Sequence, residues 1–257
     1  MGIPVRLEIN ALLLWSAISI PVILKDNCNY IFYGDENITT RPFRYRNQIH
    51  FDYSWNQSQE ATNLINDYYS NIFENLKIGS FLRPLNTITI QRTLCERYPE
   101  LYKIQMSCNS AYPKDGTFVH CNGCDKCHRT YLILKALGYD PSEISLIEEK
   151  ILKKRFSLLQ LIRSYGICPT APEELFYVLS KTNYYPDITF PNCDSMKVES
   201  LNFSKDRADA SFLDKELFDK IYPKVSWNDV LYNGKPVPLD TVYDRLKKDN
   251  YKPTYKM

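Results

Sequence analysis

The sequence predicts an α/β protein with part of a parallel sheet, flanking helices, a zinc-binding loop and a mainly helical C-terminal extension. Three observations lead to this prediction. A short aromatic and β-branched run at 29–33 is typical of a buried strand, apolar residues recur at helical spacing over 57–74, and four cysteines gather within 108–127. We therefore divide the chain into an α/β part at 1–106, a zinc loop with its following helix at 107–148, and an extension at 149–257.

The composition is that of a soluble globular protein without a strong electric field. The chain has 257 residues, 44% of them hydrophobic and 24% charged, with a net charge of +2. Such a charge does not recruit nucleic acid or an acidic membrane over the whole surface. Glycine is scarce, with 8 residues, and no GxGxxG, GxxxxGK[ST] or SGGxDS run occurs. The chain therefore lacks the loops that usually hold phosphate.

The first expected element is a helix at 7–20. The apolar stretch Ala11–Leu24 is shorter than the roughly 20 residues of a membrane span, so we expect a buried core helix and no membrane partner. Pro21 should end or kink that helix. A signal peptide is the alternative, but Glu8 stands where a leader is basic.

The predicted strand at 29–33 runs into Gly34-Asp35-Glu36. In open α/β sheets ligands bind beyond the carboxyl ends of strands, so Asp35 and Glu36 are the candidate catalytic residues. The alternative is a solvated turn that follows a strand.

The remaining elements follow from apolar periodicity and capping residues. A long loop over the site is expected at 37–56. Thr87 is a candidate N-cap and Gly138 a candidate C-terminal stop. Helices are predicted at 57–74, 87–97, 129–137, 140–166, 172–180, 211–221 and 239–248.

The cysteine spacing is the most specific signal in the chain. Cys108, Cys121, Cys124 and Cys127 follow the pattern Cys-x12-Cys-x2-Cys-x2-Cys, which offers zinc four thiolates at tetrahedral corners. A full thiolate shell makes the ion structural, with no position open for substrate.

Three alternatives to this ligand set stay open. His120 or His128 could replace one cysteine, an iron–sulfur cluster could take the same spacing, or the thiols could be metal-free. Clustered rather than spread cysteines indicate a reducing compartment, so we expect a cytoplasmic protein. The scattered cysteines are expected to be buried or free thiols, and they are Cys28, Cys95, Cys168 and Cys193.

The run from Ser107 to Cys127, followed by a helix, resembles the C-terminal zinc element of the 7-cyano-7-deazaguanine synthase family of PP-loop ATPases. Residues 1–148 as a whole are similar to relatives of that family, including the muramoyl-alanyl-glutamate epimerases. The supporting runs, each weaker than the cysteine motif, are Tyr33–Glu36, Phe51–Ser58, Phe81–Leu85 and Glu96–Leu101.

This resemblance implies an adenine nucleotide alpha hydrolase-like fold and an ATP-dependent enzyme that adenylates its substrate. Asp35 and Glu36 would then hold Mg²⁺ or orient the acceptor, because magnesium prefers oxygen ligands. The residues expected to face nucleotide or a small-molecule substrate are Arg6, Asn10, Gly34, Gln57 and Ser58. The alternative for each is a surface ion pair or a helix cap.

The chain departs from the family because it lacks the SGGxDS loop that holds pyrophosphate. It would be a truncated copy, one half of a split enzyme whose protein partner supplies the loop, or a degenerate member that binds without catalysis. The run at 2–6 looks like an internal segment, which favours the first two. A catalytically inactive, zinc-stabilised binding module is the main alternative function. A nucleic-acid binder is disfavoured by the near-neutral charge and the missing paired CxxC…HxxxH spacing.

Overall fold

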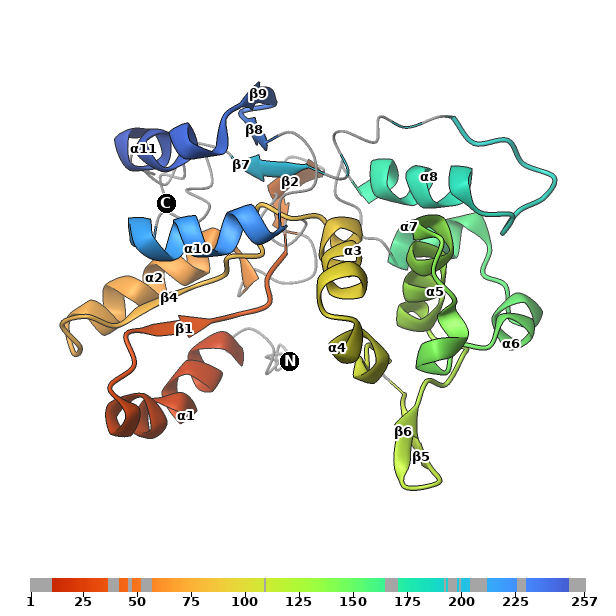
Figure 1. The fold of residues 1–257 in the computed structure, drawn as a ribbon, viewed down its shortest axis with the longest axis horizontal. Helices are drawn as coiled ribbons and strands as arrows, with labels where there is room; N and C mark the ends of the chain where they lie inside the picture. The colour runs from red at the N-terminus through yellow and green to blue at the C-terminus, as the bar shows by residue number, and fades with distance from the viewer. Residues whose placement is uncertain are drawn as a thin grey trace. The chain divides into compact units, whose positions relative to one another are not determined.

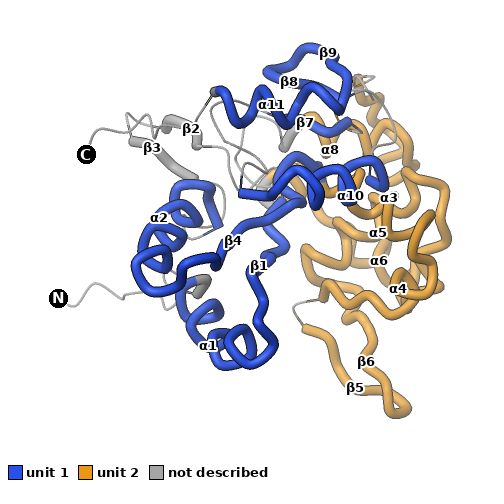
Figure 2. Tube along the Cα trace, turned by 60° about the vertical axis from the view of Figure 1, so that its left-hand side comes forward, with its two compact units in different colours: residues 1–86, 200–257 blue, residues 87–199 orange. Residues whose placement is uncertain are grey.

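The computed structural model describes residues 11–36, 42–45, 48–51, 57–108, 110–164, 171–191, 193, 198, 200–203, 212–225 and 230–249. The chain forms two compact units, each with helices and strands: unit 1 is residues 1–86 with 200–257, and unit 2 is residues 87–199 (Figure 2). The boundaries predicted after residues 106 and 148 do not coincide with these divisions, and they stay predictions.

Unit 1 combines small sheets with helices on a mixed α/β plan (Figure 1). Its described elements are α1 (Ala11–Asp26), β1 (Tyr30–Phe32), β2 (Pro42–Tyr45), β3 (Gln48–Phe51), α2 (Gln59–Ser70), β4 (Lys77–Gly79), β7 (Leu201–Phe203), α10 (Lys215–Val225), β8 (Val230–Tyr232), β9 (Lys235–Val237) and α11 (Leu239–Asp249).

Unit 2 is largely helical. Its described elements are α3 (Thr87–Arg97), α4 (Pro99–Ile104), β5 (Tyr112–Lys114), β6 (Thr117–Val119), α5 (Asp125–Leu137), the 3-10 helix η4 (Pro141–Ile144), α6 (Glu148–Lys153), α7 (Leu158–Ser164) and α8 (Ala171–Lys181).

The predicted strand at 29–33 is confirmed as β1, which pairs in parallel with β4. Parallel neighbours need a crossover connection, and α2 is the helix of the segment that joins them. One face of the pair packs on α1 and α2 through a core that includes Ile23, Ile65, Tyr69 and Ile78. The strand β4 was not predicted from the sequence, because three residues are too few to show the alternation of apolar and polar side chains.

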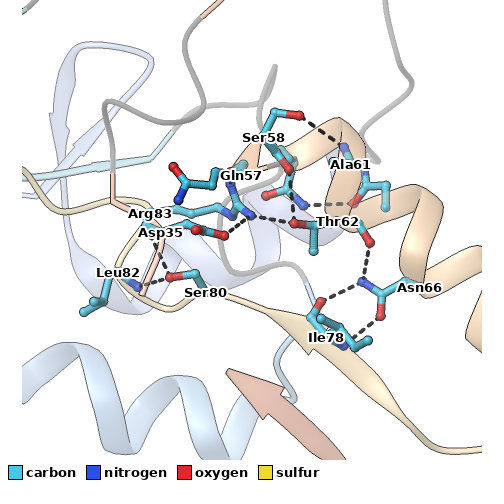
Figure 3. A network of polar contacts seen from close by, with 12 residues as sticks. Asp35, Gln57, Ser58, Ala61, Thr62, Asn66, Ile78, Ser80, Leu82 and Arg83 are labelled. Atoms are coloured by element: carbon cyan, nitrogen blue, oxygen red, sulfur yellow. Dashed lines mark hydrogen bonds and ion pairs between the residues drawn. The ribbon is translucent and has the colours of Figure 1, made fainter. Parts of the chain in front are cut away.

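The two edges of this sheet differ. The Ile78 N–H donates to Asn66 Oδ1 over 2.7 Å, and Asn66 Nδ2 donates to the Ile78 carbonyl over 2.6 Å, so a side-chain amide from α2 occupies the outer edge of β4 (Figure 3). On β1, Asn29 and Tyr33 bond to β4. Successive residues of a strand direct their backbone N–H and C=O groups to opposite edges. The groups of Tyr30 and Phe32 therefore point to the other edge of β1, with which no described strand pairs.

The helix α1 corrects two predictions. It runs past its predicted end at residue 20, through Pro21 to Asp26, so the proline does not end it, while the alternative of a kink stays a prediction. The predicted start at residue 7 lies outside the described residues. The helix is also not a buried core helix, because it is apolar on every side while only one side, with Ser16 and Ile23, meets the core. The large apolar side chains of the other side are 40% to 62% exposed, and they are Leu13, Leu14, Trp15, Ile18, Val22 and Leu24.

No helix in the described part of the chain is long and apolar enough to cross a membrane.

The C-terminal extension contains a small sheet in addition to its helices. Its strand β7 pairs in parallel with β8, and β8 pairs antiparallel with β9. The Tyr222 hydroxyl of α10 donates to the Phe81 carbonyl over 3.0 Å, and the Asn202 N–H donates to the Pro84 carbonyl over 2.8 Å. The described residues between 200 and 249 therefore pack with the other described parts of unit 1. Likewise β2 and β3 form a hairpin in the segment predicted as a loop at 37–56.

Unit 2 is built around α5, which packs against α3, α7 and α8. Gly138 has a φ of 83° and ends α5, as predicted, because glycine adopts the left-handed conformation without strain. The single helix predicted at 140–166 is instead divided into η4, α6 and α7.

The amide of Asn66 should contribute strongly to the stability of unit 1. Asn66→Ala leaves the fully buried Ile78 N–H without its partner, so we expect a loss of about 2 kcal/mol in the free energy of unfolding. Asn63→Ala on the same helix removes only a side-chain bond with Gln59 and should cost about 0.5 kcal/mol or less. Urea unfolding of both variants checks this, and equal losses would contradict it.

Candidate functional site

The four clustered cysteines are brought together by a loop that closes on the start of α5. Cys108 follows α4, and the β5–β6 hairpin returns the chain to Cys121. Asp115 and Gly116 have positive φ angles of 49° and 78°, as a tight two-residue hairpin turn requires. Cys124 is the N-cap of α5, and Cys127 lies in its first turn.

The sulfur atoms of these residues surround one point. Their ligand atoms all lie within 4.8 Å of one another. The Sγ–Sγ distance is 3.8 Å for Cys108–Cys124, 3.8 Å for Cys121–Cys127 and 3.5 Å for Cys124–Cys127. A disulfide would need about 2.05 Å, whereas sulfurs about 2.3 Å from a tetrahedral ion are about 3.8 Å apart. The group can therefore hold one metal ion, and its geometry is consistent with structural zinc.

Hydrogen bonds to sulfur favour the thiolate form that a metal requires. The N–H groups of Ser110 and Cys121 each donate to Cys108 Sγ over 3.3 Å. Burial opposes the ionisation of Cys121, but the Gly123 N–H and the thiols of Cys108 and Cys124 outweigh it and lower its pKa to about 7. Burial raises the pKa of Cys127. A bound cation would offset that cost, because metals coordinate the deprotonated sulfur.

The neighbouring histidines are engaged elsewhere. His128 Nδ1 lies 2.7 Å from the Tyr184 hydroxyl, and its ring stacks on Phe156 at 4.1 Å. His120 Nδ1 lies 2.8 Å from the Ile144 carbonyl oxygen. Burial lowers the pKa of His128 to about 4, which keeps the ring neutral. Among the described residues the group of possible metal ligands is the four cysteines, as predicted, and neither histidine belongs to it.

The iron–sulfur alternative fits this geometry less well. A cluster distributes its thiolates over several irons, which holds the sulfurs farther apart than ligands of a single ion. Four thiolates also complete a tetrahedral shell, so the ion would stabilise the loop and take no part in chemistry.

A second polar cluster lies in unit 1, where the strands β1 and β4 end (Figure 3). Arg83 Nη2 donates to Asp35 Oδ2 over 3.1 Å and to the Thr62 hydroxyl over 2.6 Å, while Nη1 donates to the Gln57 carbonyl over 2.9 Å. The Ser80 hydroxyl donates to the Asp35 carbonyl over 2.7 Å. The Arg83 and Asp35 side chains are only 1% and 5% exposed, so this is a buried ion pair.

Burial dominates the titration of this cluster. It raises the pKa of Asp35 to about 6, and the nearby Arg83 guanidinium only partly offsets the effect. The carboxyl is thus ionised at neutral pH but takes up a proton in mild acid.

The residues predicted to bind ligand differ in burial and in their contacts. Ser58 is buried and accepts a hydrogen bond from the Ala61 N–H as the N-cap of α2, which matches the alternative of a helix cap. Gly34 is exposed, Glu36 is half-buried, and the Gln57 backbone contributes to the Arg83 cluster. Arg6 and Asn10 lie outside the described residues. The roles of these residues toward nucleotide, magnesium or substrate stay predictions.

Sequence analysis missed Arg83 and Thr62 as members of this cluster. Arg83 stood only within a run that resembles the family, and nothing in its spacing points to a partner 48 residues away. No family model, curated protein or solved structure matches this chain.

Removal of one clustered thiol should abolish metal binding. Cys127→Ser leaves an incomplete shell, so the metal content should fall from about one ion per chain to near zero, with a lower melting temperature. Cys28→Ser changes an exposed thiol outside the group and should bind metal as the wild type does. Elemental analysis of protein purified without chelator checks this, and metal-free wild-type protein would contradict it.

The buried carboxyl should give stability an unusual pH dependence. The folded protein holds the Asp35 proton more tightly than the unfolded chain, so its contribution to the free energy of unfolding falls as the pH rises through about 6. Between pH 5 and pH 7 the wild type should lose about 1 kcal/mol relative to Asp35→Asn. Urea unfolding of both proteins at the two pH values measures this. A difference that is independent of pH, or that grows with it, would contradict the assignment.

Proposed function

We propose that this chain is the zinc-binding, C-terminal region of an ATP-dependent adenylating enzyme of the PP-loop type, completed by a protein partner that carries the phosphate-binding loop. The zinc ion is structural and is held by Cys108, Cys121, Cys124 and Cys127. The observation that carries the proposal is the incomplete parallel sheet of unit 1, formed by β1 and β4 alone among the described strands.

Parallel sheets are normally larger than two strands and are covered by helices on both faces. Here Asn66 occupies the outer edge of β4, so further strands can be added only beside β1. The helix α1 leads directly into β1 and exposes its apolar side. In a right-handed crossover such a helix covers the neighbouring parallel strand as well as its own. These features support a partner that supplies a parallel strand next to β1 and covers Trp15 and Ile18.

The chemistry would take place beyond the carboxyl ends of these strands. Asp35 and Glu36 follow β1, and Ser80 follows β4. In the proposed enzyme the two acidic residues orient Mg²⁺ or the acceptor. Of the predicted ligand-facing residues that the structure describes, Gly34 and Gln57 lie at this end of the sheet.

A second candidate function is a zinc-stabilised binding module without catalysis. It is favoured by a pocket of about 570 Å³ in unit 2 that lies beside the zinc loop. Ile104, Met106 and Phe118 line it together with Lys103 and Glu143. Mainly apolar pockets with a few polar groups are typical of small-ligand sites.

Reconstitution tests the first candidate. The isolated chain with Mg²⁺ and ATP should release no pyrophosphate, because the sequence has no SGGxDS loop. An in-frame SGGxDS segment in the DNA upstream or in an adjacent gene would identify the partner, and adding that polypeptide should restore release. Ile18→Glu on the exposed side of α1 should block assembly, whereas Leu64→Glu, which is also exposed but on α2, should not. A folded complex that releases no pyrophosphate would contradict the proposal.

Thermal shift measurements separate the two candidates. A surviving half-site should be stabilised by AMP or ATP, with a gain of about 2.7 kcal/mol when the ligand is at a hundred times its Kd. A binding module should show no shift with either nucleotide.

A further inference from the structure

The turn between Cys121 and Cys124 is approached by Lys154, the C-cap residue of α6. A Cβ atom on Gly123 would lie 2.9 Å from Lys154 Nζ and 3.0 Å from Lys154 Cδ. Both distances are too short for a methyl group against a side chain that stays in place. The Lys154 side chain therefore lies directly against the backbone of the turn, and it can do so because residue 123 has no side chain.

Contacts within α6 and within the turn both fix the position of Lys154 against Gly123. The fully buried Ile151 anchors α6, and the Lys154 N–H donates to the carbonyls of Lys150 and Ile151 over 3.3 Å and 3.2 Å. On the turn, the buried Asn122 donates from Nδ2 to the His120 carbonyl over 2.8 Å, and its Oδ1 accepts from the Ile147 N–H over 2.7 Å. The turn and the start of α6 are thus fixed to each other, which directs Lys154 to Gly123.

The proposed metal centre needs positive charge near this turn. Four thiolates and one divalent ion leave a net negative charge on a partly buried group. Backbone N–H groups and the start of α5, where Cys124 is the N-cap, offset part of it.

Lys154 supplies such a charge at this turn, because its Nζ would lie only 2.9 Å from a Cβ atom on Gly123, between two of the cysteine ligands. Its ammonium is therefore a group that can stabilise the metal-loaded thiolates.

We propose that Lys154 is a positioning residue of the metal centre that stabilises the thiolate-bound ion electrostatically, and that Gly123 is required because it lets the ammonium approach. This inference rests on the structural zinc ion of the proposed function. It adds α6 to the centre, although α6 supplies no ligand.

Zinc release tests the role of Lys154. Zinc-loaded full-length protein is mixed with excess EDTA, and the zinc that remains is measured over time with 4-(2-pyridylazo)resorcinol. At low ionic strength Lys154→Met should lose zinc about three to ten times faster than the wild type, and the difference should shrink in high salt. Lys154→Arg should retain most of the wild-type rate. The matched control is Lys153→Met, an exposed lysine on the same turn of α6, which should match the wild type.

Gly123→Ala tests the second half of the proposal. The methyl group should displace the ammonium and accelerate release by a similar factor, and adding Lys154→Met to it should have little further effect. Equal release from Lys154→Met and Lys153→Met, or an effect that salt does not change, would overturn the proposal while leaving the zinc centre intact. Wild-type protein that contains no zinc would overturn both the centre and this inference.

Discussion

The crowding of four sulfur atoms around one point is the constraint on which unit 2 depends. Thiols within 4.8 Å of one another gain little from mutual contact, and ionised thiolates at that distance repel. A bound metal ion would turn this repulsion into attraction and would fix Cys108, Cys121 and the first turn of α5 together. Because α5 is the helix against which α3, α7 and α8 pack, such a local ligand set would stabilise a much larger core.

Unit 1 is organised differently, around the two-stranded parallel sheet of β1 and β4. The outer edge of β4 is satisfied within the chain by Asn66, while none of the described strands pairs with the other edge of β1, and the outer side of α1 exposes apolar side chains. A two-stranded parallel sheet with one covered edge is only marginally stable on its own. Further strands would stabilise it by pairing with its backbone and burying its apolar surface. In the proposed assembly, this difference between the two edges would make β1 the edge at which further strands pair.

Local chemistry explains which features could be predicted from the sequence. The cysteine spacing, the glycine stop at Gly138 and the strand β1 each depend on a few neighbouring residues, and the structure confirms them. The strand β4, the sheet of β7, β8 and β9, and the pair of Arg83 with Asp35 depend on segments far apart in the chain, so no local pattern indicates them. The exposure of α1 was mispredicted for a related reason. An apolar helix shows that something must cover it, but its sequence does not say whether the cover lies in the same molecule.

The buried ion pair connects the sheet to the proposed chemistry. Burial of a carboxylate with a raised pKa costs stability, so the pair is a poor choice if it serves only to hold the fold together. It does, however, fix the segments that follow both strands: Arg83 binds Asp35 after β1, the start of α2 through Thr62, and the Gln57 carbonyl, while Ser80 after β4 binds the Asp35 backbone. Such a network gives the polar end of the sheet one defined geometry before any ligand arrives. A partner that brought a phosphate-binding loop to β1 would then meet a site whose acidic residues are already positioned, which is the condition under which electrostatic stabilisation of a transition state is effective.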